Sequence, residues 1–511
     1  MHAFARSKLP FALILGLVGA LLLSSTSAAL AEHTLIPEAS HGLQDTLGPE
    51  FHANPHLPRG PSRSQPHDTS PRGMLHHWNR VAIDASGLDH TPVANGETRT
   101  FGEQLGPARA SRALAIVHIA VFDAVNAIAG KYQSYTGLRP AAPGTSMEAA
   151  IAQSAHDTLV ALFPSQKAAY DAQLADDLAA IDANRPKELG IDLGKLAAAA
   201  VLALRTNDGS AHAEPRIGVE YLASTSPGSW RQDPISKSPL AMGAFWREVT
   251  PFVMVHSAQF RAPPPPTLGS AEYAQAAAEV KSIGGDGVVT PTQRTADQTE
   301  TGIFWAYDGT PSLCAPPRLY NQITMQIADQ MRSEVVELAR LLALVNTAMA
   351  DAGIAIWESK YHYELWRPIT GIREAGGDGN PATSVDLTFV PLGAPASNLT
   401  GPNFTPPFPS YPSGHAGFGG ALFQILRRFY GRDDIAFTFI SDEFNGVTLD
   451  REGNVRPFLP RRFNSLSEAE DENGQSRIYL GIHWSFDKRE GIAQGRRVAN
   501  HVFDRAFLPK R

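Results

Sequence analysis

The chain contains 511 residues, of which 43% are hydrophobic and 19% are charged, a composition typical of globular proteins that allows one large core or several domains. The formal net charge of −7 argues against a nucleic-acid-binding protein, because such proteins normally have a basic surface. Cys314 is the only cysteine of the sequence, which excludes an intramolecular disulfide.

Residues 1–31 have the pattern of a secretory signal peptide. Arg6 and Lys8 precede an apolar run from Phe11 to Leu23, and Ala29-Leu30-Ala31 forms an A-x-A cleavage site. The apolar run is short for a permanent span, although an uncleaved N-terminal anchor is the alternative. We therefore expect an exported protein, secreted or periplasmic, with no stable membrane span after signal cleavage.

Residues 32–75 are rich in His, Pro, Ser and Gly and have little apolar periodicity, which predicts a flexible lead-in. The histidines of this segment could instead form a metal-binding tract, but a polar segment without fixed structure is the simpler interpretation. They are His33, His41, His52, His56 and His67.

Residues 76–260 form the first predicted helical half. Ala- and Leu-rich segments with apolar residues every three or four positions alternate here with Pro and Gly clusters. Helices are predicted over Arg109–Ile128, Met147–Phe163, Gln166–Ile181 and Leu189–Leu204.

Residues 261–511 form the second predicted helical half, which begins with the proline-rich linker RAPPPPTLGS. The apolar stretch 338–357 is interrupted by Arg340, Asn346 and Asp351, which favours a buried helix over a membrane span. Strand-like alternation is scarce, so we predict an all-α fold of two helical halves. The helices predicted here are Glu272–Ser282, Gln293–Trp305, Arg318–Gln330, Ser333–Trp366, Gly414–Tyr430 and Leu466–Phe503.

The segment KYHYELWRP carries Lys360 and Arg367, seven positions apart. Two turns of one continuous helix would place both cations on the same face, and Pro368 would end or bend the helix just beyond. Because many such pairs lie on a solvated face, this segment alone is a weak indication of a site.

The segment FPSYPSGHAGFGGA predicts a helix start at Ser413 or Gly414. The first free amides of a helix attract an anion, Ser413 can cap the helix and donate a hydrogen bond, and Gly414 lets the backbone approach a ligand. His415 would lie beside that anion and could exchange protons with it. An ordinary capped helix with a hydrogen-bonded histidine is the alternative.

The segment SRIYLGIHWSFD places His483 and Asp487 four positions apart. On a helix, the carboxylate can fix the tautomer of the ring and leave the second nitrogen free as a nucleophile or metal ligand. Arg477 adds a planar donor suited to an oxyanion.

Taken together, the three segments offer the donors that a multiply charged tetrahedral oxyanion needs, because each charge-assisted contact offsets part of its desolvation. No ligand set for zinc or calcium is visible in these segments. The predicted site therefore suits phosphate or an ion of the same shape.

In this order, the segments resemble the K-x6-RP, PSGH and SR-x5-H-x3-D signature shared by vanadium-dependent haloperoxidases and phosphatidic-acid-phosphatase-type acid phosphatases. The chloroperoxidase branch is the most similar over about residues 285–490, through TADQTETGIFWAYDG, PPRLYNQI and DAGIAIWESKYHYELWRPITGIREA, and a weaker likeness reaches back to RASRALAIVHIAVFDAV. The resemblance implies two four-helix bundles in one mostly helical unit, with vanadate as cofactor.

The resemblance also assigns roles by position. His483 would be the metal ligand that coordinates vanadium, His415 the acid/base residue, and Asp487 the residue that orients His483. The residues implied to hydrogen-bond the vanadate oxygens are Lys360, Arg367, Ser413, Gly414 through its amide, and Arg477.

Three further residues match the family around this site. Asp308, in WAYDG, matches a carboxylate that pairs with the oxyanion-binding arginines. Trp357 and Phe408 match pocket residues of chloroperoxidases, where bromoperoxidases tend to have polar residues.

The implied partners are hydrogen peroxide, a halide (chloride or bromide) and small organic acceptors. Vanadium(V) would act as a Lewis acid, with His415 accepting a proton from peroxide and Lys360 polarising the bound peroxide for halide attack. Hypohalous acid would then leave and halogenate the acceptor.

The chain departs from the fungal chloroperoxidase pattern at Ala416-Gly417, where Ala-Thr is common, and has a shorter segment between His415 and Ser476. Halide preference and substrate access can therefore differ. The alternatives are an acid phosphatase with His483 as phosphoryl acceptor and His415 as acid, and a non-catalytic protein that keeps an oxyanion pocket. A merely binding protein would not need a proton-transferring histidine beside an oriented one.

Overall fold

The computed structural model describes residues 42–57 and 68–510. The chain divides into Met1–His33 and Thr34–Arg511, and every described residue belongs to the second unit. The predicted signal peptide, residues 1–31, lies outside the described residues.

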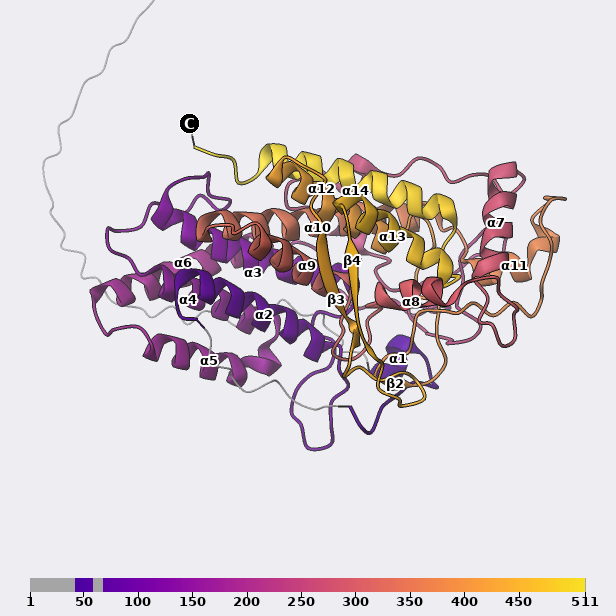
Figure 1. The fold of residues 1–511 in the computed structure, drawn as a ribbon, viewed down its shortest axis with the longest axis horizontal. Helices are drawn as coiled ribbons and strands as arrows, with labels where there is room; N and C mark the ends of the chain where they lie inside the picture. Colours follow the sequence, from indigo (N-terminus) through magenta and orange to yellow (C-terminus); the bar gives the residue numbers. More distant parts are fainter. Residues whose placement is uncertain (1–41, 58–67, 511) are drawn as a thin grey trace, which may run out of the picture. The chain divides into compact units, whose positions relative to one another are not determined.

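Helices dominate this unit (Figure 1). The α-helices of its N-terminal part are α1 (Leu43–Leu47), α2 (Pro71–Asp89), α3 (Gly106–Ala129), α4 (Met147–Leu162), α5 (Lys167–Ala179) and α6 (Arg185–Arg205). Those that follow are α7 (Ala271–Ile283), α8 (Ala296–Phe304), α9 (Pro316–Gln330), α10 (Val335–Tyr363), α11 (Pro368–Arg373), α12 (Gly414–Tyr430), α13 (Leu466–Tyr479) and α14 (Ser485–Arg505).

Short 3-10 helices and strands complete the elements. The 3-10 helices are η1 (Pro164–Gln166), η2 (Trp246–Glu248), η3 (Ser257–Phe260) and η4 (Ala375–Gly377). The strands β1 (His52–Ala53) and β2 (Leu399–Thr400) pair antiparallel, as do β3 (Phe437–Asn445) and β4 (Phe458–Phe463).

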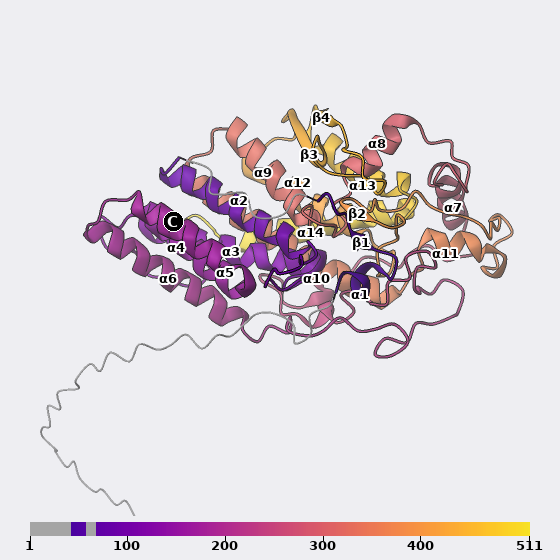
Figure 2. The same cartoon turned by 90° about the horizontal axis from the view of Figure 1, so that it is seen from below.

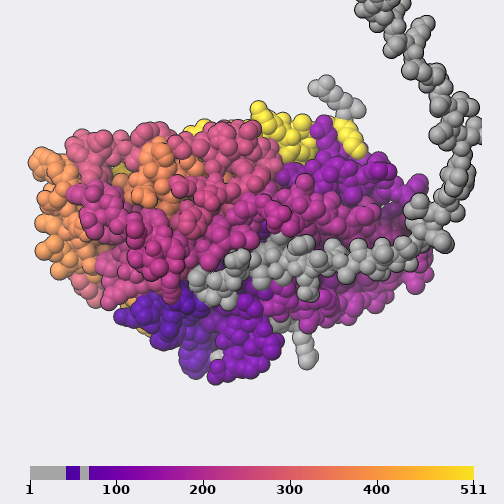
Figure 3. All heavy atoms as spheres, turned by 180° about the vertical axis from the view of Figure 1, so that it is seen from behind, coloured from indigo at the N-terminus to yellow at the C-terminus, as the bar shows by residue number. Residues whose placement is uncertain are grey.

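The helices form two groups, and besides the main hydrophobic core a second cluster contains buried apolar residues of α7 and α11. Helices α2 to α6 lie together on one side, and α7, α8, α11 and α13 lie on the other, in both ribbon views (Figures 1 and 2). Helix α10 packs against α3 of the first group and against α12 and α14. The long connection from α6 to α7 covers much of the face seen from behind, in magenta to pink (Figure 3). The predicted mostly helical fold is confirmed.

Two helices, α3 and α10, are long and apolar enough to cross a membrane by length and hydropathy, with mean hydropathies of 1.6 and 1.4. Their apolar windows are 89% and 100% buried inside the structure. The prediction of a buried helix over residues 338–357 is confirmed, because α10 packs these residues into the main core.

Two predicted helix boundaries are wrong. The single helix expected over 466–503 is divided into α13 and α14, because Gly481 adopts a φ of +71° that an L side chain disfavours and that ends the first helix. The helix expected over 333–366 ends at Tyr363, where Glu364 turns the chain with a φ of +49°.

Part of the predicted flexible lead-in is folded. Residues 42–57 contain α1 and β1, and the Phe51 side chain is fully buried against Phe404, with the ring centroids 5.6 Å apart. The strands β3 and β4 are also absent from the predicted elements, although β3 buries alternate residues as a half-covered strand does.

Candidate active site

The three sequence segments meet between helix ends, where residues of the second and third segments line a pocket and Lys360 and Arg367 lie beside it. Lys360 lies in the last turn of α10, Arg367 precedes α11, and Ser413 to His415 form the start of α12. Arg477 lies in the last turn of α13 and His483 in the connection to α14. Hydrogen bonds among these segments bring the predicted site residues together.

Helix α12 begins at Gly414, as predicted, with Ser413 as its N-cap. Ser413 Oγ accepts a long hydrogen bond of 3.4 Å from the Ala416 amide, so the hydroxyl proton remains available to another acceptor. The Ser413 amide donates to the Asp487 carbonyl at 3.0 Å, which fixes the start of α12 against the first turn of α14. The free first-turn amides of α12 therefore lie at the pocket that Gly414 lines.

Arg367 contacts His483 from the start of α11, and not from a helix face shared with Lys360. It is the N-cap residue of α11, with Pro368 as the first residue of that helix. Its Nε donates to the Phe408 carbonyl and its Nη1 to the Ile482 carbonyl, both at 2.9 Å. The same Nη1 lies 2.9 Å from His483 Nε2. The turn after α10, and not a shared helix face, brings Arg367 toward Lys360.

Lys360 is completely buried. Its Nζ donates to the carbonyls of Pro409 and Ser410, both at 2.8 Å, and lies 5.2 Å from the centroid of the Phe408 ring. Burial and the nearby Arg367 lower the pKa of Lys360 well below its usual value. An anion in the pocket would favour its charged form.

Arg477 is fully buried beside Asp308, as the sequence resemblance implies. Its Nη2 donates to Asp308 Oδ1 at 2.6 Å, whereas Nε and Nη1 have no hydrogen-bond partner. Burial raises the pKa of Asp308, and Arg477 opposes that rise. Nη2 of the guanidinium is thus paired with Asp308, and the N–H groups of Nε and Nη1 are available to an oxyanion.

His483 and Asp487 interact, although they do not lie on one helix. His483 Nδ1 lies 2.8 Å from Asp487 Oδ2, and Asp487 is in the first turn of α14. Nδ1 therefore carries the proton and Nε2 the lone pair. Burial, then Arg367, lowers the pKa of His483 well below its usual value, while burial raises that of Asp487 to about 6.

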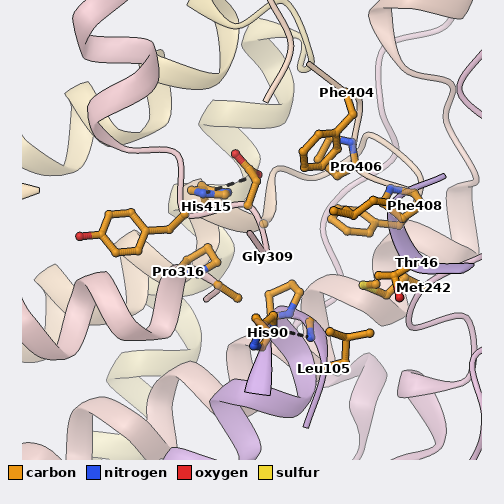
Figure 4. A pocket seen from close by; sticks show the side chains of 18 of the residues that line it. Thr46, His90, Leu105, Met242, Gly309, Pro316, Phe404, Pro406, Phe408 and His415 are labelled. Atoms are coloured by element: carbon orange, nitrogen blue, oxygen red, sulfur yellow. Dashed lines mark hydrogen bonds and ion pairs between the residues drawn. The ribbon is translucent and has the colours of Figure 1, made fainter. Parts of the chain in front are cut away.

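His415 lies on the opposite side from the apolar wall of the pocket (Figure 4). Its Nε2 donates to the Ala306 carbonyl and lies 4.0 Å from Asp308 Oδ1. Burial, followed by the charge of Arg477, lowers the pKa of His415 well below its usual value. The ring is therefore neutral at neutral pH, with the Nδ1 lone pair available to accept a proton.

The pocket has a volume of about 600 Å³, including space open to solvent. Trp357 and Phe408 line it, with ring centroids 5.0 Å apart. Figure 4 shows Phe408 and Met242 on the side across from His415. The charged groups thus face an apolar wall, which limits their contact with water.

The buried charges of the pocket suit a bound oxyanion. Three buried basic side chains, Lys360, Arg367 and Arg477, lie near two buried carboxyl groups, Asp308 and Asp487. In the described residues, the buried nitrogens without a partner include Arg367 Nη2 and both Nε and Nη1 of Arg477. Because unpaired buried N–H groups are costly, an anion that accepts from them would complete the site. The donor set therefore fits vanadate as well as phosphate.

Sequence reasoning missed several residues at the site. The hydroxyl of Ser410 donates to Asp487 Oδ2, and Ser410 is fully buried. In the sequence, only its position within FPSYPSGH could have indicated that it belongs to the site. Met242, His90 and Thr46 line the pocket from segments distant in sequence, and no local pattern indicates their position.

Comparisons with known proteins identify the family. The chain is 31% identical over 487 residues to the vanadium chloroperoxidase of Curvularia inaequalis, covering 80% of this chain and 78% of the relative. Residues 340–508 match the family described as the VCPO second helical-bundle domain.

Solved structures share the fold. A bacterial vanadium-dependent iodoperoxidase superposes with a TM-score of 0.69 at 22% identity, over 88% of this chain and 100% of that chain. An apo bacterial vanadium-dependent chloroperoxidase superposes with a TM-score of 0.59 at 17% identity, over 78% and 94%. From the identity to the fungal enzyme over most of both chains, we conclude that this protein belongs to the vanadium-dependent haloperoxidase family.

Proposed function

We propose that the protein is exported and uses vanadate and hydrogen peroxide to oxidise chloride or bromide to hypohalous acid, which halogenates small organic acceptors. The unpartnered, buried N–H groups of Arg367 and Arg477 beside two neutral histidines are the observation that carries this proposal. Buried N–H groups of native proteins usually have a hydrogen-bond partner, and a bound oxyanion would supply one for these donors.

The residues fall into two groups around the cofactor. The vanadate oxygens would accept from Lys360, Arg367, Arg477, Ser413 Oγ and the Gly414 amide, and His483 Nε2 would be the ligand. When bound, vanadate supplies the Lewis acidity that activates hydrogen peroxide without a change in the oxidation state of the metal.

His483 is prepared as a ligand by the hydrogen bond from its Nδ1 to Asp487. This bond fixes the tautomer and the ring orientation and makes Nε2 a better donor of its lone pair. The Arg367 Nη1–H group that contacts His483 Nε2 would donate its hydrogen bond to an oxyanion oxygen instead once the cofactor is bound.

His415 is the proton acceptor. Its Nε2–H is held by the Ala306 carbonyl, so Nδ1 can accept a proton as peroxide enters the pocket. The lowered pKa keeps the base form present at neutral pH.

Lys360 provides positive charge at the wall that Phe408 and Trp357 form. Here it would draw electron density from peroxide and leave one oxygen open to halide attack. The aromatic wall excludes water, which strengthens these electrostatic interactions.

The proposal is tested by halogenation of a dye by the purified protein with vanadate and peroxide, in parallel with chloride, bromide and iodide. We expect turnover with bromide and chloride, and inhibition by phosphate. Turnover with iodide alone would contradict the halide assignment. Aryl phosphate hydrolysis without vanadate, with no halogenation, would instead support the phosphatase.

The ligand assignment is tested by His483→Ala, with the exposed His362→Ala as control. We expect His483→Ala to lose halogenation and His362→Ala to keep it. Unchanged halogenation by His483→Ala would show that His483 is not the ligand.

Export is tested by the N-terminal sequence of the protein recovered from its native host. We expect the chain to begin at Glu32, after the A-x-A site. Recovery of the protein with residues 1–31 intact would contradict a cleaved signal.

A further inference from the structure

A methionine lies in the wall of the proposed active site. Met242 lines the pocket together with His415, Phe408 and Trp357, and Figure 4 shows its sulfur-bearing side chain beside Phe408 and Thr46. Among the described residues that line this pocket, Met242 is the only methionine. Its thioether thus lies in the wall of the pocket in which the oxidised halogen would form.

The position of the sulfur is closely fixed. A Cβ placed on Gly106 would lie 2.7 Å from Met242 Sδ, so the thioether packs directly against the Gly106 backbone. Gly106 is the first residue of α3 and has a φ of +83°. Only a glycine leaves room for the sulfur at this wall.

We propose that Met242 is a site of self-oxidation, converted to methionine sulfoxide by hypohalous acid before this product leaves the pocket. The inference rests on the proposed function, which supplies the oxidant. Sulfur is a soft nucleophile and methionine is a common target of oxidation.

The reaction balances with hypohalous acid as the only oxidant. The sulfur lone pair attacks the halogen, a sulfur–halogen bond forms, and the halogen–oxygen bond breaks to release hydroxide. Water then attacks sulfur and halide leaves. The net products are sulfoxide, halide and one proton; sulfur loses the two electrons that the halogen gains.

Oxidation at this position would disturb the aromatic wall. The Met242 carbonyl accepts hydrogen bonds from Trp357 Nε1 at 3.1 Å and from Tyr361 Oη at 2.9 Å, and its amide donates to the Pro407 carbonyl at 2.9 Å. A sulfoxide oxygen is polar and would need a partner in a wall that offers mainly rings and aliphatic groups. Turnover would therefore be accompanied by a progressive loss of rate.

The other methionines allow a sharp comparison. Met147 and Met331 are more exposed than Met242, which is 8% exposed, and neither lines the pocket. Met254 is buried to a similar extent, at 5% exposure, outside the pocket. Oxidant arriving from solvent would modify Met147 and Met331 first, whereas oxidant formed in the pocket would modify Met242 first.

The experiment follows the holoenzyme through successive turnovers with vanadate, peroxide and bromide, with dye halogenation as the measure of activity. Peptide mass spectrometry should show a gain of about 16 Da, one oxygen atom, first on the Met242 peptide. Peroxide without bromide should leave Met242 unmodified. Hypobromite added from outside should modify Met147 and Met331 before Met242.

Two variants test the consequence. The halogenation rate of each variant is divided by its own initial rate and followed against the number of turnovers. The rate of Met242→Leu should decline more slowly than that of the unsubstituted protein. Met254→Leu, the matched buried control, should lose rate as the unsubstituted protein does.

The outcomes separate this inference from the function on which it rests. Absence of dye halogenation would overturn the proposed function and this inference with it. Halogenation that leaves Met242 unmodified, or that oxidises Met147 and Met331 first, would overturn this inference alone.

Discussion

Ser410 connects the residues predicted to hold and activate the cofactor. Its hydroxyl donates to Asp487 Oδ2, the oxygen that also accepts from His483 Nδ1, and its carbonyl accepts from Lys360 Nζ at 2.8 Å. The Ser410 amide donates to the Leu365 carbonyl at 2.9 Å, so its backbone is fixed. We therefore expect Ser410 to be a positioning residue, which would act on the cofactor through Asp487 and the proposed ligand His483.

We expect Ser410→Ala to weaken vanadate binding roughly fivefold, because a buried hydrogen bond contributes about 1 kcal/mol and the backbone contact to Lys360 is kept. Calorimetric titration with vanadate measures the dissociation constant without an activity assay. Ser410→Thr, which keeps a hydroxyl, should restore part of the affinity.

Ser154→Ala is the matched control, since Ser154 is fully buried on α4 and donates its hydroxyl to the Ile151 carbonyl at 3.1 Å. Its vanadate affinity should be unchanged. An equal loss of affinity in Ser154→Ala and Ser410→Ala would indicate a general effect on stability and contradict the positioning role.

The buried His118 on α3 should make the free energy of unfolding depend on pH. The ring is 3% exposed, its Nε2 has no partner, and burial lowers its pKa to about 3. The folded-state pKa lies below the unfolded value of about 6.5, so its contribution is present above pH 6.5 and is lost as the pH falls toward 3. At pH 5 the loss from this group is roughly 2 kcal/mol.

We therefore expect His118→Leu to lose less free energy of unfolding between pH 7.5 and pH 5 than the unsubstituted protein, by roughly 2 kcal/mol. Urea unfolding at the two pH values measures this difference. The exposed His362→Leu is the control and should keep the original pH dependence. Identical pH dependence in His118→Leu and the unsubstituted protein would exclude His118 as the source.

At the scale of the elements, α12 and α14 approach each other through glycines. A Cβ on Gly495 would lie 2.0 Å from the Gly417 carbonyl oxygen, and one on Gly491 would lie 2.7 Å from the Ser413 carbonyl oxygen. Because Ser413 caps α12 and Asp487 lies in the first turn of α14, this close packing sets the distance between two parts of the site.

Gly495→Ala should destabilise the fold by about 1–3 kcal/mol, because the added methyl group must separate two backbones. It should also weaken vanadate binding, because the start of α12 moves away from Asp487. Thermal unfolding and vanadate titration measure the two effects. Gly376→Ala is the control, since no atom lies within 4 Å of a Cβ at Gly376. Unchanged stability in Gly495→Ala would contradict the close approach of α12 and α14.

The sequence predicted most helices but placed two site residues on the wrong elements. Lys360 and Arg367 were assigned to one helix face, whereas the turn at Glu364 separates them. His483 and Asp487 were assigned to one helix, whereas Gly481 ends α13 and leaves His483 in the connection. Helical periodicity continues across both breaks, so only packing and the backbone angles at these turns reveal them.

At the scale of the whole molecule, the site holds more buried basic side chains than buried carboxyl groups. Lys360, Arg367 and Arg477 exceed Asp308 and Asp487 in number, and three of the guanidinium nitrogens have no partner. A bound oxyanion would therefore lower the cost of burying these charges. Cofactor binding and folding stability should be coupled.

We expect vanadate at about 100 times its dissociation constant to raise the free energy of unfolding by about 2.7 kcal/mol. Phosphate should give a similar rise at the same multiple of its own dissociation constant, because it presents the same tetrahedral oxygens and binds the folded site. Chemical unfolding with and without each anion measures the shift, and sodium chloride at equal ionic strength is the control. No shift with either anion would contradict an oxyanion site.

The sequence by itself determined the helical class and predicted the residues that we propose for the site, because apolar periodicity and the three spaced motifs are local properties of the chain. It also predicted the N-cap at Ser413, which depends on the few residues around it. Only the tertiary structure decided which N–H groups of Arg367 and Arg477 remain unpaired, and that Ser410 and Met242 belong to the pocket. These features depend on contacts between α10, α12, α14 and loops far apart in sequence, whose relative positions are set by the packing of the core and by no local pattern.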